Sequence, residues 1–385
     1  MKRLILVIIL SISWGGLQAQ NVLDEAQAAL SAKDYAKARN LIEQAKKDPS
    51  LAELPRTHYL SGFIYKEIYT NAADIYPSSR QIALESFGAC VAIADNNPYR
   101  EDCKGLRQYM LTTYFNDGVN AFNTNDYAGA GQYFSAYIEA QLPEAAPEVY
   151  ANALFYGGLA AEYQGYKDRA IEYYEKALSF DMQEPSLYAQ LAYLYEGAND
   201  QANAIRVLDL GGDRFPRDTD LLVARINIYL SFEKYLAAEP IAEQYLQLYP
   251  DDREVLLVAG TIYQHNAATK PGDKDTYHAK CNDVYQQVLK AEPDNYLANY
   301  NLGILLFNRA VDLIKLQEYD ISVTSLDEVI NESSRLFREA LPYIERANQL
   351  KPNNRNALFA LAGIYYNMND SARLAEVEQK LETLN

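Results

Sequence analysis

Residues Ala151–Asp218 read ANALFYGGLAAEYQGYKDRAIEYYEKALSFDMQEPSLYAQLAYLYEGANDQANAIRVLDLGGDRFPRD, which is one pattern written twice, 34 residues apart. Gly158 of the first copy corresponds to Ala192 of the second, and Ala170 corresponds to Ala204. A repeat of this length is typical of two short helices that form a hairpin. The apolar face of one hairpin is buried only when neighbouring hairpins stack on it, so we expect an array of hairpins.

The second copy carries its marks at the spacing of a known family. These marks are Tyr188, Leu191, Ala192, Tyr195, Ala204, Leu208 and Pro216. The chain therefore resembles a tetratricopeptide repeat (TPR) protein, and weaker copies of the pattern extend the resemblance from about residue 22 to the C-terminus. The resemblance implies an all-α fold, a right-handed superhelical solenoid of about nine TPR hairpins.

The first nineteen residues differ from the rest. Lys2 and Arg3 precede the short apolar run Leu4–Ile12, and Leu17-Gln18-Ala19 provides a small-residue cleavage site. We interpret residues 1–19 as a secretory signal peptide, because the apolar run is too short to span a membrane. The alternative is a single N-terminal anchor helix. Residues 20–385 are expected to form one solenoid, exported to a bacterial periplasm or associated with the cell envelope.

Four segments depart from the repeat. LPEAAPE at 142–148 contains two prolines and predicts a bend. Extra residues lie near 69–79 and 266–275, the latter with the turn signal Pro271-Gly272. The largest insertion, near 310–334, continues an apolar stripe at helical spacing, and it predicts a helical arm that lengthens both helices of its hairpin. Such an arm provides a contact surface for a partner or for a second copy, or it packs on the 266–275 insertion.

Composition limits the partners. The net charge is −17, and removal of residues 1–19 would take away two more positive charges, Lys2 and Arg3. Such an acidic chain repels nucleic acid and anionic membrane surfaces. No further apolar run is long enough to predict a membrane span in the mature chain.

The sequence contains no catalytic or nucleotide-binding motif that we could identify, so we predict a protein that is not an enzyme and needs no cofactor. His278 and Cys281 share a helix face, with His265 across the 266–275 insertion, which is the one arrangement that resembles a zinc site. However, Cys281 occupies a position where the repeat places a small buried residue, and a structural zinc site needs four ligands. We therefore predict no metal site.

Two of the three cysteines, Cys90 and Cys103, flank a predicted turn at equal heights of an antiparallel hairpin. An exported protein can form disulfides, and a bridge here would add roughly 3 kcal/mol in the chain-entropy model. The alternative is two reduced, buried thiols.

In TPR proteins the first helix of each hairpin lines the concave groove, and the resemblance implies which positions face it. The predicted groove residues are mostly aromatic or carry amides: Asn152, Phe155, Tyr193, Asn227, Gln264, Tyr300, Phe307, Phe359 and Tyr366. Lys and Arg are nearly absent among them, so the carboxylate-clamp activity of some TPR modules is not implied. For each aromatic residue the alternative is packing against the neighbouring helix.

These observations predict a non-catalytic exported scaffold that binds a protein or peptide partner through the groove and the arm. Self-association through the 310–334 arm is a further expectation. The alternative function is a glycan-binding or cell-wall-binding module, since Tyr rings stack on sugars and amides bind hydroxyl groups. The identity of the partner does not follow from the sequence, because fold does not fix function.

Overall fold

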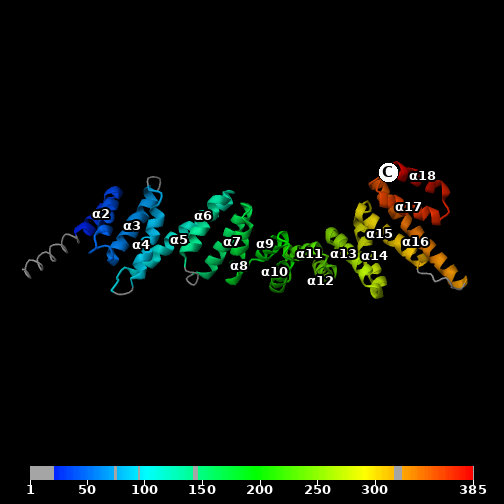
Figure 1. Cartoon of the computed structure of the whole chain (residues 1–385), viewed down its shortest axis with the longest axis horizontal. Helices are drawn as coiled ribbons and strands as arrows, with labels where there is room; N and C mark the ends of the chain where they lie inside the picture. Colours follow the sequence, from blue (N-terminus) through cyan, green and yellow to red (C-terminus); the bar gives the residue numbers. More distant parts are fainter. Residues whose placement is uncertain (1–20, 73–75, 94–95, 142–145, 316–322, 385) are drawn as a thin grey trace, which may run out of the picture. The chain divides into compact units, whose positions relative to one another are not determined.

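The all-α fold class is confirmed by the structure. The computed structural model describes residues 21–72, 76–93, 96–141, 146–315 and 323–384, and within these ranges it contains helices and turns but no strand. Figure 1 shows helix following helix along the chain. The predicted signal peptide, residues 1–19, lies outside the described residues, as do residues 142–145 of the expected bend.

The chain divides into two compact units, Met1–Gln183 and Glu184–Asn385. In unit 1, residues 21–31 are helical and precede the labelled helices. Those helices are α2 (Tyr35–Lys47), α3 (Pro55–Ala72), α4 (Ser79–Ala92), α5 (Arg100–Asn123), α6 (Tyr127–Ala140), α7 (Pro147–Tyr163) and α8 (Lys167–Ser179).

Unit 2 has its own continuous hydrophobic core, which extends from Leu222 to Val377. Its helices are α9 (Pro185–Gly197), α10 (Gln201–Arg214), α11 (Thr219–Ser231), α12 (Tyr235–Leu248), α13 (Arg253–Thr269), the short 3-10 helix η2 (Pro271–Asp273), α14 (Lys274–Ala291), α15 (Tyr296–Lys315), α16 (Val323–Leu350), α17 (Arg355–Asn367) and α18 (Ser371–Thr383).

The helices pair as the repeat pattern predicts. Each odd-numbered helix from α3 to α17 packs against the even-numbered helix that follows it. The turn within a hairpin keeps one backbone conformation through successive repeats, because Gly165, Asn199 and Glu233 all have positive φ, at 81°, 57° and 56°. These three residues are 34 positions apart, so the period of the sequence is also the period of the backbone.

Small residues let the two helices of a hairpin approach closely. A Cβ placed on Gly158 of α7 would lie 2.4 Å from the ring of Tyr174 on α8, and a Cβ on Gly260 of α13 would lie 2.4 Å from Tyr285 on α14. Both rings are fully buried. A glycine in the first helix therefore makes room for a large aromatic side chain from the second helix.

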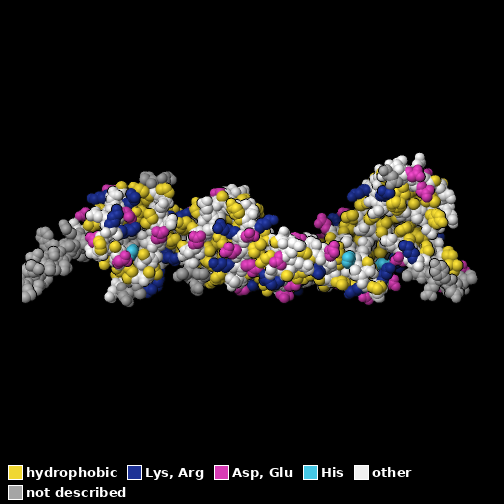
Figure 2. All heavy atoms as spheres, viewed as in Figure 1, with side chains coloured by type: hydrophobic (Ala, Val, Ile, Leu, Met, Phe, Trp, Pro, Cys, Tyr) yellow, Lys and Arg dark blue, Asp and Glu magenta, His cyan; other side chains and the backbone are white. Residues whose placement is uncertain are grey.

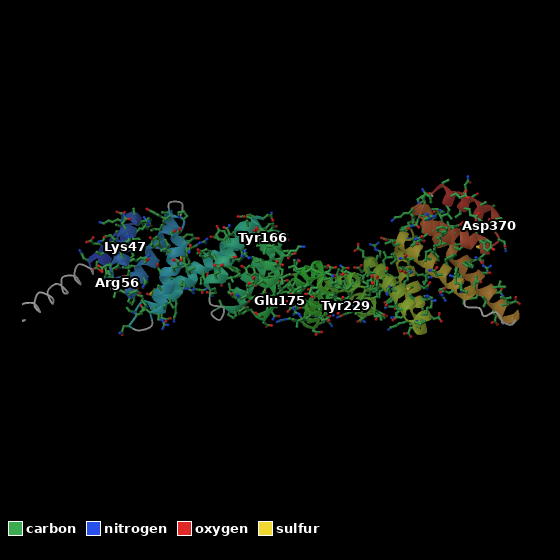
Figure 3. The ribbon with its side chains drawn as sticks, in the orientation of Figure 1. Lys47, Arg56, Tyr166, Glu175, Tyr229 and Asp370 are labelled. Atoms are coloured by element: carbon green, nitrogen blue, oxygen red, sulfur yellow. A yellow bond between two sulfur atoms is a disulfide. The ribbon has the colours of Figure 1, made fainter. Side chains whose placement is uncertain are left out.

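A second recurring contact joins successive hairpins. The hydroxyl group of a tyrosine on the first helix of a hairpin donates to a carboxylate twenty residues earlier, on the second helix of the preceding hairpin. Examples in the described part of unit 2 are Tyr229 with Asp209 at 2.7 Å, Tyr263 with Glu243 at 3.3 Å and Tyr365 with Glu345 at 2.8 Å. Tyr229 is labelled among the helices of unit 2 in Figure 3.

Two of the insertions lie largely within the described residues. Near 266–275, α13 continues to Thr269 and α14 begins at Lys274, with η2 between them. Near 310–334, α15 continues to Lys315 and α16 begins at Val323, which makes these helices 20 and 28 residues long. The intervening residues 316–322 and the side chains of 323–325 lie outside the described part. Residues 73–75 of the 69–79 insertion also lie outside it.

Among the helices of the described residues, none has the length and apolar character needed to span a membrane.

Candidate functional site

The structure corrects one predicted groove residue, Phe155. Its side chain is 7% exposed, and its ring lies 6.0 Å from that of Tyr174 and 5.5 Å from that of Tyr156. Helix α7 packs against both α6 and α8, so this position faces the core and not solvent. Phe155 is therefore a packing residue. Asn152, on the same helix, is half-buried.

Three predicted residues follow on separate helices of unit 2. Tyr193 on α9 and Asn227 on α11 are exposed, and Gln264 on α13 is half-buried. Each lies on the first helix of its hairpin, as the repeat pattern predicts. Among the described residues, no hydrogen bond or ring contact joins these three side chains.

The remaining four predicted residues lie on two neighbouring helices, α15 and α17. Phe307 of α15 contacts Gly363 of α17 so closely that a Cβ on Gly363 would lie 2.8 Å from the ring. Phe359 and Tyr366 lie four residues before and three residues after Gly363, on the same side of α17. We call Tyr300, Phe307, Phe359 and Tyr366 the aromatic face.

The members of the aromatic face differ in exposure. Tyr300 and Phe307 pack partly on the core, with Phe307 5.7 Å from the ring of Phe337. Phe359 is 53% exposed and Tyr366 is 71% exposed. Arg355 lies 5.6 Å from the centre of the Phe359 ring, which places a cation beside the exposed aromatic side chains. Figure 2 shows hydrophobic side chains gathered over the helices at the C-terminal end of unit 2.

The stripe of α15 that carries Tyr300 and Phe307 continues toward the arm. Ile304 and Val311 pack partly on the core at helical spacing, and Ile314, one turn further, is exposed. On α16, Leu326 and Ile330 are exposed as well. We call Ile314, Leu326 and Ile330 the arm patch. The aromatic face and the arm patch thus share helix α15.

The three residues of the suspected zinc site have separate environments. Cys281 is fully buried, and its thiol donates to the carbonyl oxygen of Gly260 at 3.6 Å. Burial raises the pKa of this thiol to about 12, so it is not a thiolate at neutral pH. The His265 ring stacks on Tyr235 with the ring centres 3.7 Å apart. Nowhere in the described residues do three or more potential metal ligands gather.

The structure joins Cys90 of α4 to Cys103 of α5 by a disulfide, with the Cα atoms 6.2 Å apart. Both cysteines are fully buried. The bond connects the end of one helix to the start of the next. It belongs to unit 1, whereas the aromatic face belongs to unit 2.

Sequence reasoning missed the use of tyrosine hydroxyl groups as internal donors. Tyr263 donates to Glu243, and Tyr277 donates to Glu239 at 3.0 Å. Lys280 lies 2.7 Å from both carboxylates and holds the cluster together. These hydroxyl groups therefore donate their hydrogen bonds to carboxylates of the protein itself. For Tyr263 the signal that could have revealed the bond is the twenty-residue offset between tyrosine and carboxylate, which recurs at Tyr229 and Tyr365, whereas Tyr277 and Glu239 are 38 residues apart.

Comparisons with known proteins give likenesses to solved structures. No protein-family model and no curated protein sequence matches the chain. A TPR protein from Parabacteroides merdae matches 71% of this chain and 93% of its own, at 14% identity and a TM-score of 0.40. The C-terminal part of a TPR repeat-containing protein from Cytophaga hutchinsonii matches 78% of this chain and 99% of its own, at 16% identity and a TM-score of 0.44.

A third similar structure is YrrB, described as a TPR protein with an unusual peptide-binding site. It matches 49% of this chain and 89% of its own, at 16% identity and a TM-score of 0.39. These likenesses concern the arrangement of helices, and they assign no ligand or partner to this chain.

Proposed function

We propose that this protein is a non-catalytic scaffold that holds a segment of a protein partner against the aromatic face of unit 2. The observation that carries the proposal is the exposure of Phe359 and Tyr366 on one side of α17, beside Phe307. Large aromatic side chains gain the most free energy when they are removed from water. A face with several of them is therefore typical of a contact surface.

The composition of the face favours a peptide. Aromatic residues and arginine are the residue types enriched where protein interfaces gain most of their binding energy. Phe359, Tyr366 and Arg355 supply these types within three turns of one helix. The neighbouring Phe307 is fixed by Gly363 and Phe337, so part of the face is rigid before a partner binds.

The arm patch extends the proposed contact surface. Ile314 lies two helical turns beyond Phe307 on the same stripe of α15, and Leu326 and Ile330 lie on α16. A partner segment that covers the aromatic face could therefore continue along the arm. A second copy of the chain is the other occupant that the patch would fit, and solution mass distinguishes the two.

Export is part of the proposal and is supported by the sequence alone. Lys2, Arg3 and the apolar run that follows have the order of a signal peptide. We infer that the mature chain begins at Gln20 and is periplasmic or associated with the cell envelope. N-terminal sequencing of the protein from its native cells tests this, and a retained Met1 would contradict it.

Selection of a random dodecapeptide phage library on the full mature chain tests the scaffold function. We expect selected peptides to bind with a Kd of about 1–100 μM, and to lose about tenfold or more in affinity for Phe359→Ala/Tyr366→Ala. Tyr166→Ala is the matched control, because Tyr166 is 58% exposed on unit 1, where Figure 3 labels it.

Peptides that bind the double variant as well as the wild type would contradict the proposed site. Calorimetry with soluble polysaccharides tests the alternative function, which is glycan binding. If a polysaccharide binds, the double variant weakens that binding, and no peptide is selected, the face is a glycan platform and the peptide proposal is wrong.

A further inference from the structure

The two insertions of unit 2 meet at a pocket. The start of α14 lines one side of it, the end of α15 lines another, and α16 completes it. The pocket has a volume of about 180 Å³. Its apolar wall consists of Leu313 and Leu336, and the rest of the lining is ionisable. The repeat pattern places no functional position here, so this site is separate from the predicted groove.

Four of the ionisable side chains near this pocket are already paired or exposed. Lys274 of α14 lies 2.6 Å from Asp312 of α15, an ion pair that ties the first insertion to the second. Glu332 of α16 accepts a hydrogen bond from Arg335 at 2.8 Å. Asp275 is exposed at the rim.

The other two ionisable groups are donors with no partner among the described residues. His278 of α14 is 9% exposed and makes no hydrogen bond there, although it lines the pocket. Arg309 of α15 is half-buried and forms no ion pair there. His278 is not among the side chains of the described residues whose polar atoms are sealed from solvent without a partner, so its ring reaches the pocket. Both donors are therefore open to a ligand that enters the pocket.

We propose that this pocket binds a carboxylate group carried on a short aliphatic stem. The Arg309 guanidinium would hold the two carboxylate oxygens, His278 would donate an N–H, and Leu313 and Leu336 would contact the stem. The guanidinium fork matches the geometry of a carboxylate, and such charge-assisted bonds are stronger than neutral ones.

The charges around the pocket favour a carboxylate over a phosphate. Asp312 is already paired with Lys274, and Glu332 is paired with Arg335, so Arg309 is the cation of the lining that can receive a ligand. With three carboxylates around the same space, a ligand of one negative charge is repelled less than a dianionic phosphate. Burial, together with Arg309 and Lys274, lowers the pKa of His278, which leaves a neutral imidazole with one N–H to donate at neutral pH.

The size of the pocket supports the same ligand class. A water molecule takes about 30 Å³ of liquid volume, so the pocket admits a carboxylate with a few methylene groups. Such a group is present in a free short-chain acid and in a glutamate side chain of a protein partner. The inference does not depend on the aromatic face, because it shares no residue with it.

The experiment follows the ring protons of the three histidines by NMR in the full mature chain while sodium butyrate is added. We expect the His278 signal, assigned with His278→Gln, to shift and saturate with a Kd of about 1–10 mM. The signals of His58 and His265 serve as internal controls and should stay in place. Butyramide, which has the same shape without the charge, should leave His278 unchanged.

Substitutions at Arg309 distinguish a built site from a general charge effect. Arg309→Gln should weaken butyrate binding about tenfold or more, and Arg309→Lys should weaken it by less, since it keeps the charge without the fork. Arg338→Gln, on the exposed side of α16, is the matched control and should bind as the wild type does. Unshifted His58 and His265 signals confirm that each variant is folded.

Blocked amino acids distinguish the two sources of the carboxylate. N-acetyl-glutamate amide that shifts His278 more strongly than butyrate identifies a protein side chain as the natural ligand, whereas the reverse order identifies a free acid, and both results support the pocket. The proposal is wrong if neither probe shifts His278 at 100 mM, or if Arg309→Gln and Arg309→Lys both respond as the wild type does.

Discussion

Tyr365 of α17 donates its hydroxyl group to Glu345 of α16 at 2.8 Å, and this bond connects the last two hairpins of unit 2. Arg373 of α18 lies 3.2 Å from the same carboxylate, so three helices meet at one acidic side chain. Tyr229 and Arg225, both on α11, likewise contact Asp209 of α10, with Arg225 at 3.4 Å. The contact between hairpins is therefore partly polar, even though the core around it is apolar.

This arrangement predicts a loss of stability in alkali. Burial and the hydrogen bond to Glu345 raise the pKa of Tyr365 to about 12, and burial and Asp209 do the same for Tyr229. The pKa of an unfolded tyrosine is about 10. The stabilisation is therefore complete below pH 10 and is lost as the pH rises toward 12, because the unfolded chain loses the proton first.

Tyr365→Phe tests the bond directly. We expect the variant to lose about 0.5–1.5 kcal/mol of unfolding free energy at pH 8, and to show a shallower decline between pH 10 and 12. Urea unfolding followed by circular dichroism measures both. Tyr366→Phe is the control, because the neighbouring hydroxyl is on a side chain that is 71% exposed. Equal effects of the two substitutions would contradict the role of the bond.

A second prediction concerns the close approach of α7 and α8. Gly158→Ala should destabilise the protein by about 1–3 kcal/mol, because the added methyl group overlaps the fully buried ring of Tyr174. Gly105→Ala, in the second turn of α5, meets no atom within 4 Å and should stabilise the protein by about 0.5–1 kcal/mol. Thermal unfolding of both variants gives the comparison, and a stabilising Gly158→Ala would contradict the packing argument.

The repeat period explains which features the sequence could predict. Gly158 and Ala170 occupy small-residue positions that recur in the second copy as Ala192 and Ala204, and both are buried. Their positions recur every 34 residues, so several repeats of the sequence predict the same local geometry. The pairing of consecutive helices follows from the same period.

Features that depend on how a particular helix is covered could not be predicted. Phe155 occupies a position that the family pattern places in the groove, but α6 and α8 both pack on its helix and bury it. The pocket beside Arg309 is formed where two insertions meet. The insertions are not part of the repeat, so the repeat pattern does not predict where their residues lie. Lys274 and Asp312 are 38 residues apart in the sequence, and their ion pair appears only in three dimensions.

A third prediction concerns the bond between Cys90 and Cys103. Mass mapping without reduction should find their peptides joined, and Cys281 should react with an alkylating reagent only after unfolding. Reduction should lower the unfolding free energy by about 3 kcal/mol, since the bond closes a short loop. Cys90→Ala/Cys103→Ala, which has no bond to lose, should not respond to reductant. Alkylation of both thiols in the untreated protein would show that the bond is absent.

The last prediction concerns the arm patch, whose side chains are exposed although they are apolar. Ile314→Ser/Leu326→Ser/Ile330→Ser should leave the melting temperature within about 3 °C of the wild type, because these side chains are 44%, 44% and 51% exposed. If the patch contacts a partner or a second copy, the variant should lose that contact. Sedimentation equilibrium measures self-association, and the peptides selected on the wild type measure partner binding.

A matched variant, Leu210→Ser/Leu236→Ser/Leu248→Ser, controls for the general loss of exposed apolar surface. These leucines are 50%, 46% and 40% exposed and lie on α10 and α12, away from the arm in sequence. We expect this control to keep the wild-type mass and peptide affinity. If the arm variant also keeps both, the patch is not a binding element, and the interaction surface is confined to the aromatic face.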